Sequence, residues 1–230
     1  MKKKDFKLLL VDDEPDILEI LSYNLFQEGY QIFTATNGLE ALEKAKEINP
    51  HLIILDVMMP EMDGIEACNE LRKLPQLNST IITFLTARSE DYSQLAGFEA
   101  GADDYMSKPI KPKVLVSKIK ALLRRFKEED LIDAKDKIIQ VDHLKIDREL
   151  YKVFINDKEI SLPRKEFELL FLLASKPGKV FTRQEIMSTI WGTEVVVGGR
   201  TIDVHMRKLR EKLNEDIFKT IKGVGYKMEF

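Results

Sequence analysis

The first half of the chain alternates short apolar runs with segments of helical periodicity. Such runs are typical of parallel strands buried on both faces, and the segments between them carry apolar residues three or four apart. The predicted strands are Leu8–Val11, Gln31–Thr34, Leu52–Asp56, Thr80–Thr86 and Asp104–Ser107. The predicted helices are Pro15–Glu28, Gly38–Ile48, Gly64–Leu74, Tyr92–Ala100 and Lys111–Glu128. This (βα)5 order predicts an α/β domain with a doubly wound parallel sheet.

The pattern changes class after residues 127–136, which are dense in charge and poor in large apolar side chains. We interpret that segment as a linker between one domain of residues 1–126 and another of residues 137–230. Short strands come first in the second domain, and we expect them at Ile138–Val141, His143–Ile146, Lys152–Ile155 and Glu159–Ser161. We then expect helices at Arg164–Ser175, Thr182–Ile190 and Arg200–Asn214, and a closing hairpin at Ile217–Phe230. This order predicts a small α+β winged helix-turn-helix domain.

Two local signals support these boundaries. Thr182 is a good N-cap, and Glu185 three residues later predicts a capping box. Asn156 and Asp157 separate two strand-like runs and predict a hairpin turn.

The composition is that of a soluble globular protein. Of 230 residues, 44% are hydrophobic and 33% are charged, and no run approaches the roughly 20 apolar residues that span a bilayer. The single cysteine, Cys68, cannot form an internal disulfide and fits a reducing compartment. With no export signal in view, the chain is predicted to be cytoplasmic. The net charge of −3 combines an acidic first half with a basic second half, which indicates different partners for the two domains but favours nucleic acid only weakly.

Polar side chains follow four of the five predicted parallel strands. Asp12 and Asp13 follow the first, Asp56 ends the third, Thr86 ends the fourth and Lys108 follows the fifth. The carboxyl ends of parallel strands meet at one edge of a sheet, so these groups are expected to lie together. Taken singly, a threonine ending a strand and a lysine before proline are ordinary features. Together, three carboxylates that can hold Mg²⁺, with a hydroxyl and an amine that can bind phosphoryl oxygens, predict a phosphoryl-transfer site in which an aspartate can itself be the nucleophile.

These residues also carry a resemblance to the receiver domain of two-component response regulators. The matching stretches run from Val11 to Pro15, Leu55 to Gly64, Phe84 to Ala87 and Gly101 to Pro109. The resemblance implies that Asp56 accepts a phosphoryl group from a sensor histidine kinase. It also implies that Mg²⁺ is bound by the carboxylates of Asp12, Asp13 and Asp56 and by the main-chain carbonyl of Met58.

The same resemblance implies a conformational switch. Thr86 moves toward the phosphoryl group, and Tyr105 turns from an exposed to a buried position. The peptide bond between Lys108 and Pro109 is implied to be cis, which proline makes inexpensive.

Regulators of this kind that bind DNA dimerise through charge pairs on the receiver domain. The pairs that the resemblance implies here are Asp104 with Arg125, Asp103 with Lys118, and Glu99 with Lys120. A further pair falls on Gln94 and Val114 and is absent from this chain.

The helix predicted at Arg200–Asn214 has an apolar stripe and a basic outer side. The stripe comprises Ile202, Met206, Leu209 and Leu213, and the residues outside it are Arg200, Val204, His205, Arg207, Lys208 and Lys212. A basic face often serves only solubility, but it is also what a helix in a DNA major groove requires.

The second domain resembles the effector domain of OmpR/PhoB-type regulators. The matching residues lie at Leu162–Leu170, Trp191–Gly192, Arg200–His205 and Gly223–Tyr226. The resemblance implies DNA contacts by Arg200, Val204, His205, Arg207, Lys208 and Arg210, with Lys222 and Lys227 on or near the wing. It assigns the loop Gly192–Gly199 to RNA polymerase. Lys208 stands where the family has arginine and cannot form the same bidentate contact with guanine, so the target sequence does not transfer.

The sequence therefore predicts a transcription factor that binds promoter DNA as a dimer when Asp56 is phosphorylated. Its receiver would catalyse only its own phosphorylation and dephosphorylation. One alternative is a regulator that binds DNA without phosphorylation. Another is a Mg²⁺-dependent phosphatase with Asp56 as a transient nucleophile, but such enzymes need an acid–base residue two positions later, where this chain has Met58.

Overall fold

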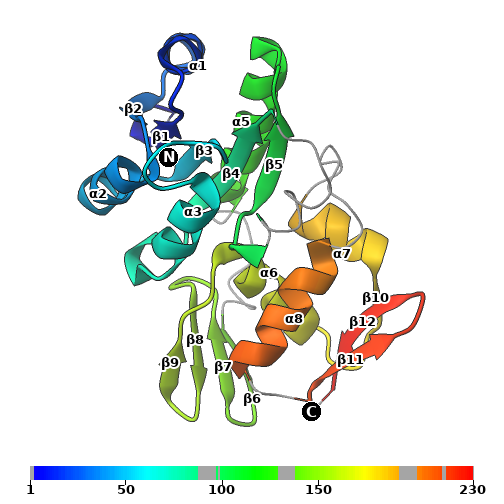
Figure 1. Ribbon diagram of the computed structural model, residues 1–230. Helices are drawn as coiled ribbons and strands as arrows, with labels where there is room; N and C mark the ends of the chain where they lie inside the picture. Colours follow the sequence, from blue (N-terminus) through cyan, green and yellow to red (C-terminus); the bar gives the residue numbers. More distant parts are fainter. Residues whose placement is uncertain are drawn as a thin grey trace. The chain divides into compact units, whose positions relative to one another are not determined.

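The computed structural model describes residues 3–87, 97, 99–128, 138–191, 201–213 and 216–229, with only the backbone at Thr86 and at residues 124–128. The chain divides into two compact units, Met1–Leu131 and Ile132–Phe230. Each unit has its own hydrophobic core. Figure 1 shows the helices and strands of both units.

The first unit is a parallel sheet with the strand order β2-β1-β3-β4-β5. Its strands are β1 (Lys7–Val11), β2 (Gln31–Ala35), β3 (Leu52–Leu55), β4 (Ile81–Thr86) and β5 (Asp104–Ser107). Its helices are α1 (Pro15–Gln27), α2 (Gly38–Ile48), α3 (Gly64–Arg72) and α5 (Pro112–Glu128), with short 3-10 helices at η1 (Lys3–Asp5) and η2 (Pro75–Leu77). The prediction of a doubly wound α/β fold is confirmed. Of the helix predicted at Tyr92–Ala100, only Gly97, Glu99 and Ala100 lie within the described residues.

The apolar runs are continuous because both faces of the sheet are covered. Leu8 and Leu10 of β1 share a hydrophobic cluster with Leu21 of α1 and Ile119 of α5. Leu9 is fully buried too, and since side chains alternate along a strand it faces the opposite side. There α2 and α3 lie side by side (Figure 1).

The strand register brings the predicted acids to one edge of the sheet. Val11 is paired with Leu55, so β1 and β3 end at the same level. The backbone N–H of Asp12 then donates to the carbonyl of Ala35 at 3.2 Å, and that of Asp56 donates to the carbonyl of Val11 at 2.9 Å. Asp12 and Asp56 are therefore the first residues beyond the ends of two neighbouring strands.

Among its described residues, the second unit has two small antiparallel sheets and three helices. Four strands form the first sheet in sequence order, namely β6 (Ile138–Val141), β7 (Leu144–Asp147), β8 (Lys152–Ile155) and β9 (Lys158–Ile160). The helices are α6 (Arg164–Ala174), α7 (Arg183–Ile190) and α8 (Thr201–Leu213). The second sheet has the order β10-β12-β11, from β10 (Phe181–Thr182), β11 (Phe218–Ile221) and β12 (Gly225–Met228). Helices followed by a hairpin fit the predicted winged-helix domain.

Strand β10 was not predicted from the sequence. A strand of two residues has no periodicity to detect, and it forms only because β12 pairs with it. The approach is close, since a Cβ on Gly225 would lie 2.0 Å from the carbonyl oxygen of Phe181. Glycine is therefore required at the start of β12.

Both local signals in the second unit are confirmed. Asn156 and Asp157 have φ angles of 49° and 62°, which suit a tight hairpin turn. Thr182 and Glu185 form the capping box: the Thr182 N–H donates to the Glu185 carboxylate at 2.7 Å, and the Glu185 N–H donates to the Thr182 hydroxyl oxygen at 3.1 Å. The hydrogen bonds from Thr182, with help from Lys179, lower the pKa of Glu185 to about 2.

Within the part of the chain that the structure describes, no helix has the length and apolar character needed to cross a membrane.

The capping box predicts a pH-dependent contribution to the stability of the second unit. The pKa of Glu185 is about 2 in the folded chain, against an ordinary value of 4.5, so its contribution is complete above pH 4.5 and is lost as the pH falls toward 2. Glu185→Gln is expected to lower the urea midpoint at pH 7 and to differ progressively less from wild type below pH 4.5. The fluorescence of Trp191, the only tryptophan, reports this unit in the full chain.

Glu211→Gln is the matched control, because Glu211 lies on α8 and takes no part in the capping box. A Glu185→Gln difference that stays constant from pH 7 to pH 3 would contradict the assignment.

Candidate functional site

Three carboxylates lie together at the carboxyl edge of the parallel sheet. Asp12, Asp13 and Asp56 each place one oxygen within 4.8 Å of the others. Asp12 and Asp56 are buried and Asp13 is exposed. One oxygen of Asp12 accepts the Glu14 N–H at 3.1 Å, and one oxygen of Asp56 accepts the Val57 N–H at 2.7 Å. The backbone that follows each strand thus helps to orient the acid.

Lys108 reaches this cluster from the loop that follows β5, the edge strand of the sheet. Its Nζ lies 2.8 Å from Asp12, 3.0 Å from Asp56 and 3.1 Å from Glu14. The Lys108–Pro109 bond is cis, as predicted. Burial by itself would lower the pKa of Lys108, but the hydrogen bonds to these carboxylates outweigh it and raise the pKa above its usual value. The ammonium therefore stays charged next to the acids.

The cluster has the ligands that a hard cation requires. Burial raises the pKa of Asp12 despite the opposing hydrogen bonds from Lys108 and from the Glu14 N–H. Three converging carboxylate oxygens match the ligand preference of Mg²⁺, so Asp12, Asp13 and Asp56 fit such an ion. Ligation by the Met58 carbonyl stays a prediction.

Gly64 allows the backbone to turn tightly behind Asp56. A Cβ on Gly64 would lie 1.9 Å from the carbonyl oxygen of Asp56, far inside van der Waals contact. The Gly64 N–H donates to the Val57 carbonyl at 2.9 Å, and Asp63 caps α3 by accepting the Glu66 N–H at 2.8 Å. Gly64 was predicted only as the start of a helix, although a glycine eight residues after Asp56 is visible in the sequence.

Tyr105 occupies one of the two positions that the switch prediction requires. Its side chain is buried, with the ring 6.4 Å from that of Phe84. Burial and the nearby charge of Asp56 raise its pKa to about 12. Thr86 ends β4 opposite Ser107, but its side chain lies outside the described residues. The coupling between Thr86 and Tyr105 stays a prediction.

Asp103 differs from its predicted place on a dimer surface. It is almost completely buried, and its carboxylate accepts hydrogen bonds from Arg72 at 2.7 Å and from the Ile82 N–H at 2.8 Å. Arg72 also donates to carbonyls of the segments that precede β4 and β5. Asp103 was expected to pair with Lys118 of a second chain, but here its carboxylate is paired with Arg72 of the same chain.

Two other predicted dimer residues, Lys118 and Lys120, also have partners within the chain. Lys118 donates to the carbonyl of Tyr105 at 3.3 Å and lies 3.8 Å from Asp104. Lys120 lies 2.9 Å from Glu28 at the end of α1, and Glu28 also pairs with Lys3 at 2.7 Å. Glu99 and Val114 are exposed, whereas Gln94 and the side chain of Arg125 lie outside the described residues. Pairing across two chains stays a prediction.

The helix α8 has the predicted apolar stripe. Ile202, Met206, Leu209 and Leu213 all belong to the core of the second unit, together with Trp191. His205 is also buried, and its ring lies 5.4 Å from that of Trp191. The stripe prediction placed His205 outside, but three residues after Ile202 it falls on the same side of the helix. Val204 is buried as well.

The basic residues of α8 and the hairpin are exposed to different degrees. The Arg207 side chain is 57% exposed and lies 3.4 Å from Glu211. Lys208 is half-buried, Lys222 is exposed at the hairpin turn, and Lys227 pairs with Glu229. The loop Gly192–Gly199 and Arg200 lie outside the described residues.

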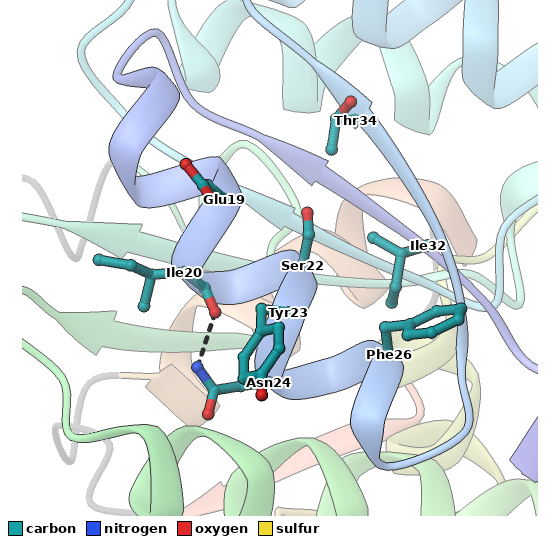
Figure 2. Close-up of a pocket in the computed structure, with 8 residues that line it drawn as sticks. All are labelled: Glu19, Ile20, Ser22, Tyr23, Asn24, Phe26, Ile32 and Thr34. Atoms are coloured by element: carbon teal, nitrogen blue, oxygen red, sulfur yellow. Dashed lines mark hydrogen bonds between the residues drawn. The ribbon is translucent and has the colours of Figure 1, made fainter.

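A separate groove lies between α1 and the edge strand β2 (Figure 2). It has a volume of about 530 Å³ and is lined by Glu19, Ile20, Ser22, Tyr23, Asn24, Phe26, Ile32 and Thr34. Tyr23 and Phe26 are well exposed, and the Asn24 amide donates to the carbonyl of Ile20 at 2.7 Å. Nothing in the described part of the chain shows what would cover this surface.

Comparison with known proteins assigns a family to each unit. Residues 8–120 match the response regulator receiver domain, and residues 157–228 match the C-terminal domain of transcriptional regulatory proteins. The chain is 42% identical to the transcriptional regulatory protein SrrA of Staphylococcus aureus, over 97% of this chain and 95% of that protein.

Two solved structures cover nearly the whole chain. A RitR mutant is 28% identical, with a TM-score of 0.79 over 97% of this chain and 99% of that one. DrrB of Thermotoga maritima, described as an OmpR/PhoB homolog, is 36% identical, with a TM-score of 0.51 over 98% of this chain and 99% of that one.

The close approach at Gly64 predicts that even a methyl group disturbs the site. Gly64→Ala is expected to destabilise the first unit by about 1–3 kcal/mol, as overpacking does, because the Asp56 backbone has to move. Urea unfolding followed by far-ultraviolet circular dichroism measures the loss, and Trp191 fluorescence is expected to show an unchanged second unit.

Gly178→Ala serves as the comparison, since no atom lies within 4 Å of a Cβ at that position. Its φ of 79° is left-handed, so alanine there would strain the backbone. Because Gly178 lies in the second unit, the first unit is expected to keep its stability. A Gly64→Ala protein with wild-type stability in the first unit would contradict the geometry.

Proposed function

Because the chain belongs to the OmpR/PhoB-type response regulators, we propose that it is a cytoplasmic transcriptional regulator whose DNA binding is switched by phosphorylation of Asp56. One observation carries the proposal. Asp12, Asp13 and Asp56 converge within 4.8 Å, and the ammonium of Lys108 lies 3.0 Å from Asp56. This combines a carboxylate nucleophile, the ligands for a divalent cation and a fixed positive charge.

The chemistry is phosphoryl transfer from the histidine of a sensor kinase. An oxygen of Asp56 forms the new bond to phosphorus while the bond from phosphorus to the imidazole nitrogen breaks, and that nitrogen becomes available to a proton from solvent. Mg²⁺ held by Asp12, Asp13 and Asp56, and by the carbonyl of Met58, would neutralise charge on the phosphoryl oxygens.

The remaining residues of the site bind the product and respond to it. Lys108 stays protonated and pairs with one phosphoryl oxygen, while Thr86 donates to another. The inward movement of Thr86 favours the buried position of Tyr105. Phosphorylation biases this equilibrium only by the difference in its interaction with the two conformations.

The output is dimerisation and binding to tandem half-sites in promoter DNA. On the receiver unit, Glu99, Asp104, Lys118, Lys120 and Arg125 are the proposed dimer residues. Asp103 is not among them because its carboxylate already accepts from Arg72 and from the Ile82 N–H within the unit. Asp104 is equally buried, with Lys118 at 3.8 Å, and would have to become accessible to meet Arg125.

The proposed DNA contacts are Arg200, Arg207 and Lys208 with Lys222 and Lys227. The exposed side chain of Arg207 supports this part best. Val204 and His205 would have to leave the core to reach a base. Arg210 bonds to the hairpin instead. The loop Gly192–Gly199 is the proposed contact for RNA polymerase.

Phosphorylation is tested with a small phosphoryl donor. With acetyl phosphate and Mg²⁺, the wild-type chain is expected to gain the mass of one phosphoryl group, and Asp56→Asn is expected to gain none. Asp13→Asn is expected to weaken Mg²⁺ binding by at least about tenfold, since even outer partners of metal ligands contribute that much.

Asp16→Asn is the control, because Asp16 is an exposed acid on the first turn of α1, outside the cluster. Uptake of a phosphoryl group by Asp56→Asn at the wild-type rate would show that another residue is the acceptor.

DNA binding is tested by selection from a random duplex pool, with and without beryllium fluoride as the phosphoryl mimic. We expect the mimic to enrich a tandem repeat, and Asp56→Asn to remove the response. Arg207→Ala is expected to weaken binding by about tenfold or more. It is also expected to make the slope of log K against log salt concentration shallower by about 1.

Lys152→Ala, at a lysine of β8 that pairs with Glu159 and is not among the proposed DNA contacts, is expected to bind as the wild type does. Identical selection with and without the mimic would instead establish a regulator that works without phosphorylation.

A further inference from the structure

Three elements of the second unit meet at one carboxylate oxygen of Asp203. Asp203 lies on α8, and its Oδ1 is 2.5 Å from Nη2 of Arg183, the first residue of α7. The hydroxyl of Tyr226, on β12, donates to the same oxygen. Arg183 Nη2 also lies 3.2 Å from the Tyr226 hydroxyl. A single acid thus connects the two helices and the hairpin.

Arg183 is itself attached to the hairpin. Its backbone N–H donates to the carbonyl of Val224 at 3.1 Å, within the turn between β11 and β12. Its guanidinium carbon lies 5.3 Å from the centre of the Tyr226 ring. Because Arg183 is held at both its backbone and its side chain, its ion pair with Asp203 transmits the position of the hairpin to α8.

A second contact joins α8 to the hairpin two turns further along. Arg210 Nη2 lies 3.0 Å from the carbonyl oxygen of Phe218 and 2.8 Å from Oγ1 of Thr220, both on β11. Asp203 and Arg210 are seven residues apart, which corresponds to about 10 Å along a helix and nearly the same side of it. Two contacts on one side fix both the tilt and the rotation of α8 relative to the hairpin.

Arg207 lies between these two contacts. It is four residues after Asp203 and three before Arg210, so all three occupy one side of the helix. The orientation of α8 therefore decides where the most exposed basic side chain of this helix points.

We propose that Asp203 is a positioning residue for DNA recognition, which holds α8 at the angle to the hairpin that base reading requires. The inference rests on the proposed DNA-binding function. It makes a prediction opposite to that of simple electrostatics. An acid on a helix near DNA repels phosphates, so charge alone predicts tighter binding when the acid is removed. Positioning predicts weaker binding to the specific sequence.

The experiment compares the full-length wild type with Asp203→Asn and Glu211→Gln. Each is titrated with the duplex enriched in the selection and with a random duplex of the same length. Glu211 is the matched control, because it is an exposed acid on the same helix that pairs with Arg207 and not with the hairpin. We expect Glu211→Gln to bind both duplexes at least as tightly as the wild type.

Asp203→Asn is expected to lose at least about tenfold in affinity for the selected duplex, comparable to a mismatched base pair. Its affinity for the random duplex is expected to be unchanged or slightly higher, since that binding depends on phosphate contacts alone. The ratio of the two affinities distinguishes positioning from a general loss of structure, which would weaken both. Tyr226→Phe removes only the hydroxyl that bonds Asp203 and is expected to lower the same ratio, even if Asp203→Asn folds poorly.

Two results would overturn the inference. If the wild type prefers the selected duplex and both Asp203→Asn and Tyr226→Phe keep that preference, Asp203 has no positioning role while the proposed function stands. If the wild type prefers no duplex over random DNA, the proposed function fails and the inference fails with it.

Discussion

The first unit depends on the contact between the ammonium of Lys108 and the carboxylates of Asp12 and Asp56. Both acids follow strands that are not neighbours of β5 in the sheet. Lys108 follows β5, whereas Asp12 follows β1, and β3 and β4 lie between them in the sheet. The sheet is apolar on both faces, so its charged groups can collect only at the strand ends. There three acids would repel one another, and Lys108 offsets part of that repulsion. The same crowding of negative charge suits the site to a divalent cation and to a phosphoryl group.

Ion pairs between distant segments recur elsewhere in the chain. Arg72 joins α3 to the start of β5 through Asp103, and in the second unit Lys212 of α8 lies 2.7 Å from the buried Glu166 of α6. Losing one partner of such a pair leaves an uncompensated buried charge, which costs more than the pair contributes. These contacts therefore act mainly as constraints on geometry. They hold elements at defined positions, which a protein that passes a conformational signal requires.

Much of the fold follows from the sequence because its signals are local. The runs at β1 and β3, the glycine and proline boundaries, and the capping box at Thr182 are each contained within a few residues. The acid cluster was predictable too, because parallel strands bring their carboxyl ends together. The features that were missed depend on partners far along the chain. Strand β10 exists only through β12, and Asp103 is buried because Arg72, 31 residues earlier, reaches it. His205 was predicted to lie outside the apolar stripe because histidine is polar. Its position three residues after Ile202 places it on the buried side of the helix.

The ion pair between Lys120 and Glu28 has a consequence for association of two chains. If Lys120 meets Glu99 of a second chain, it has to leave Glu28, which keeps Lys3 as a partner. The ion pair of Lys120 with Glu28 is then exchanged for one with Glu99 of the second chain. The exchange would make such a contact selective for the right partner while adding little to its strength.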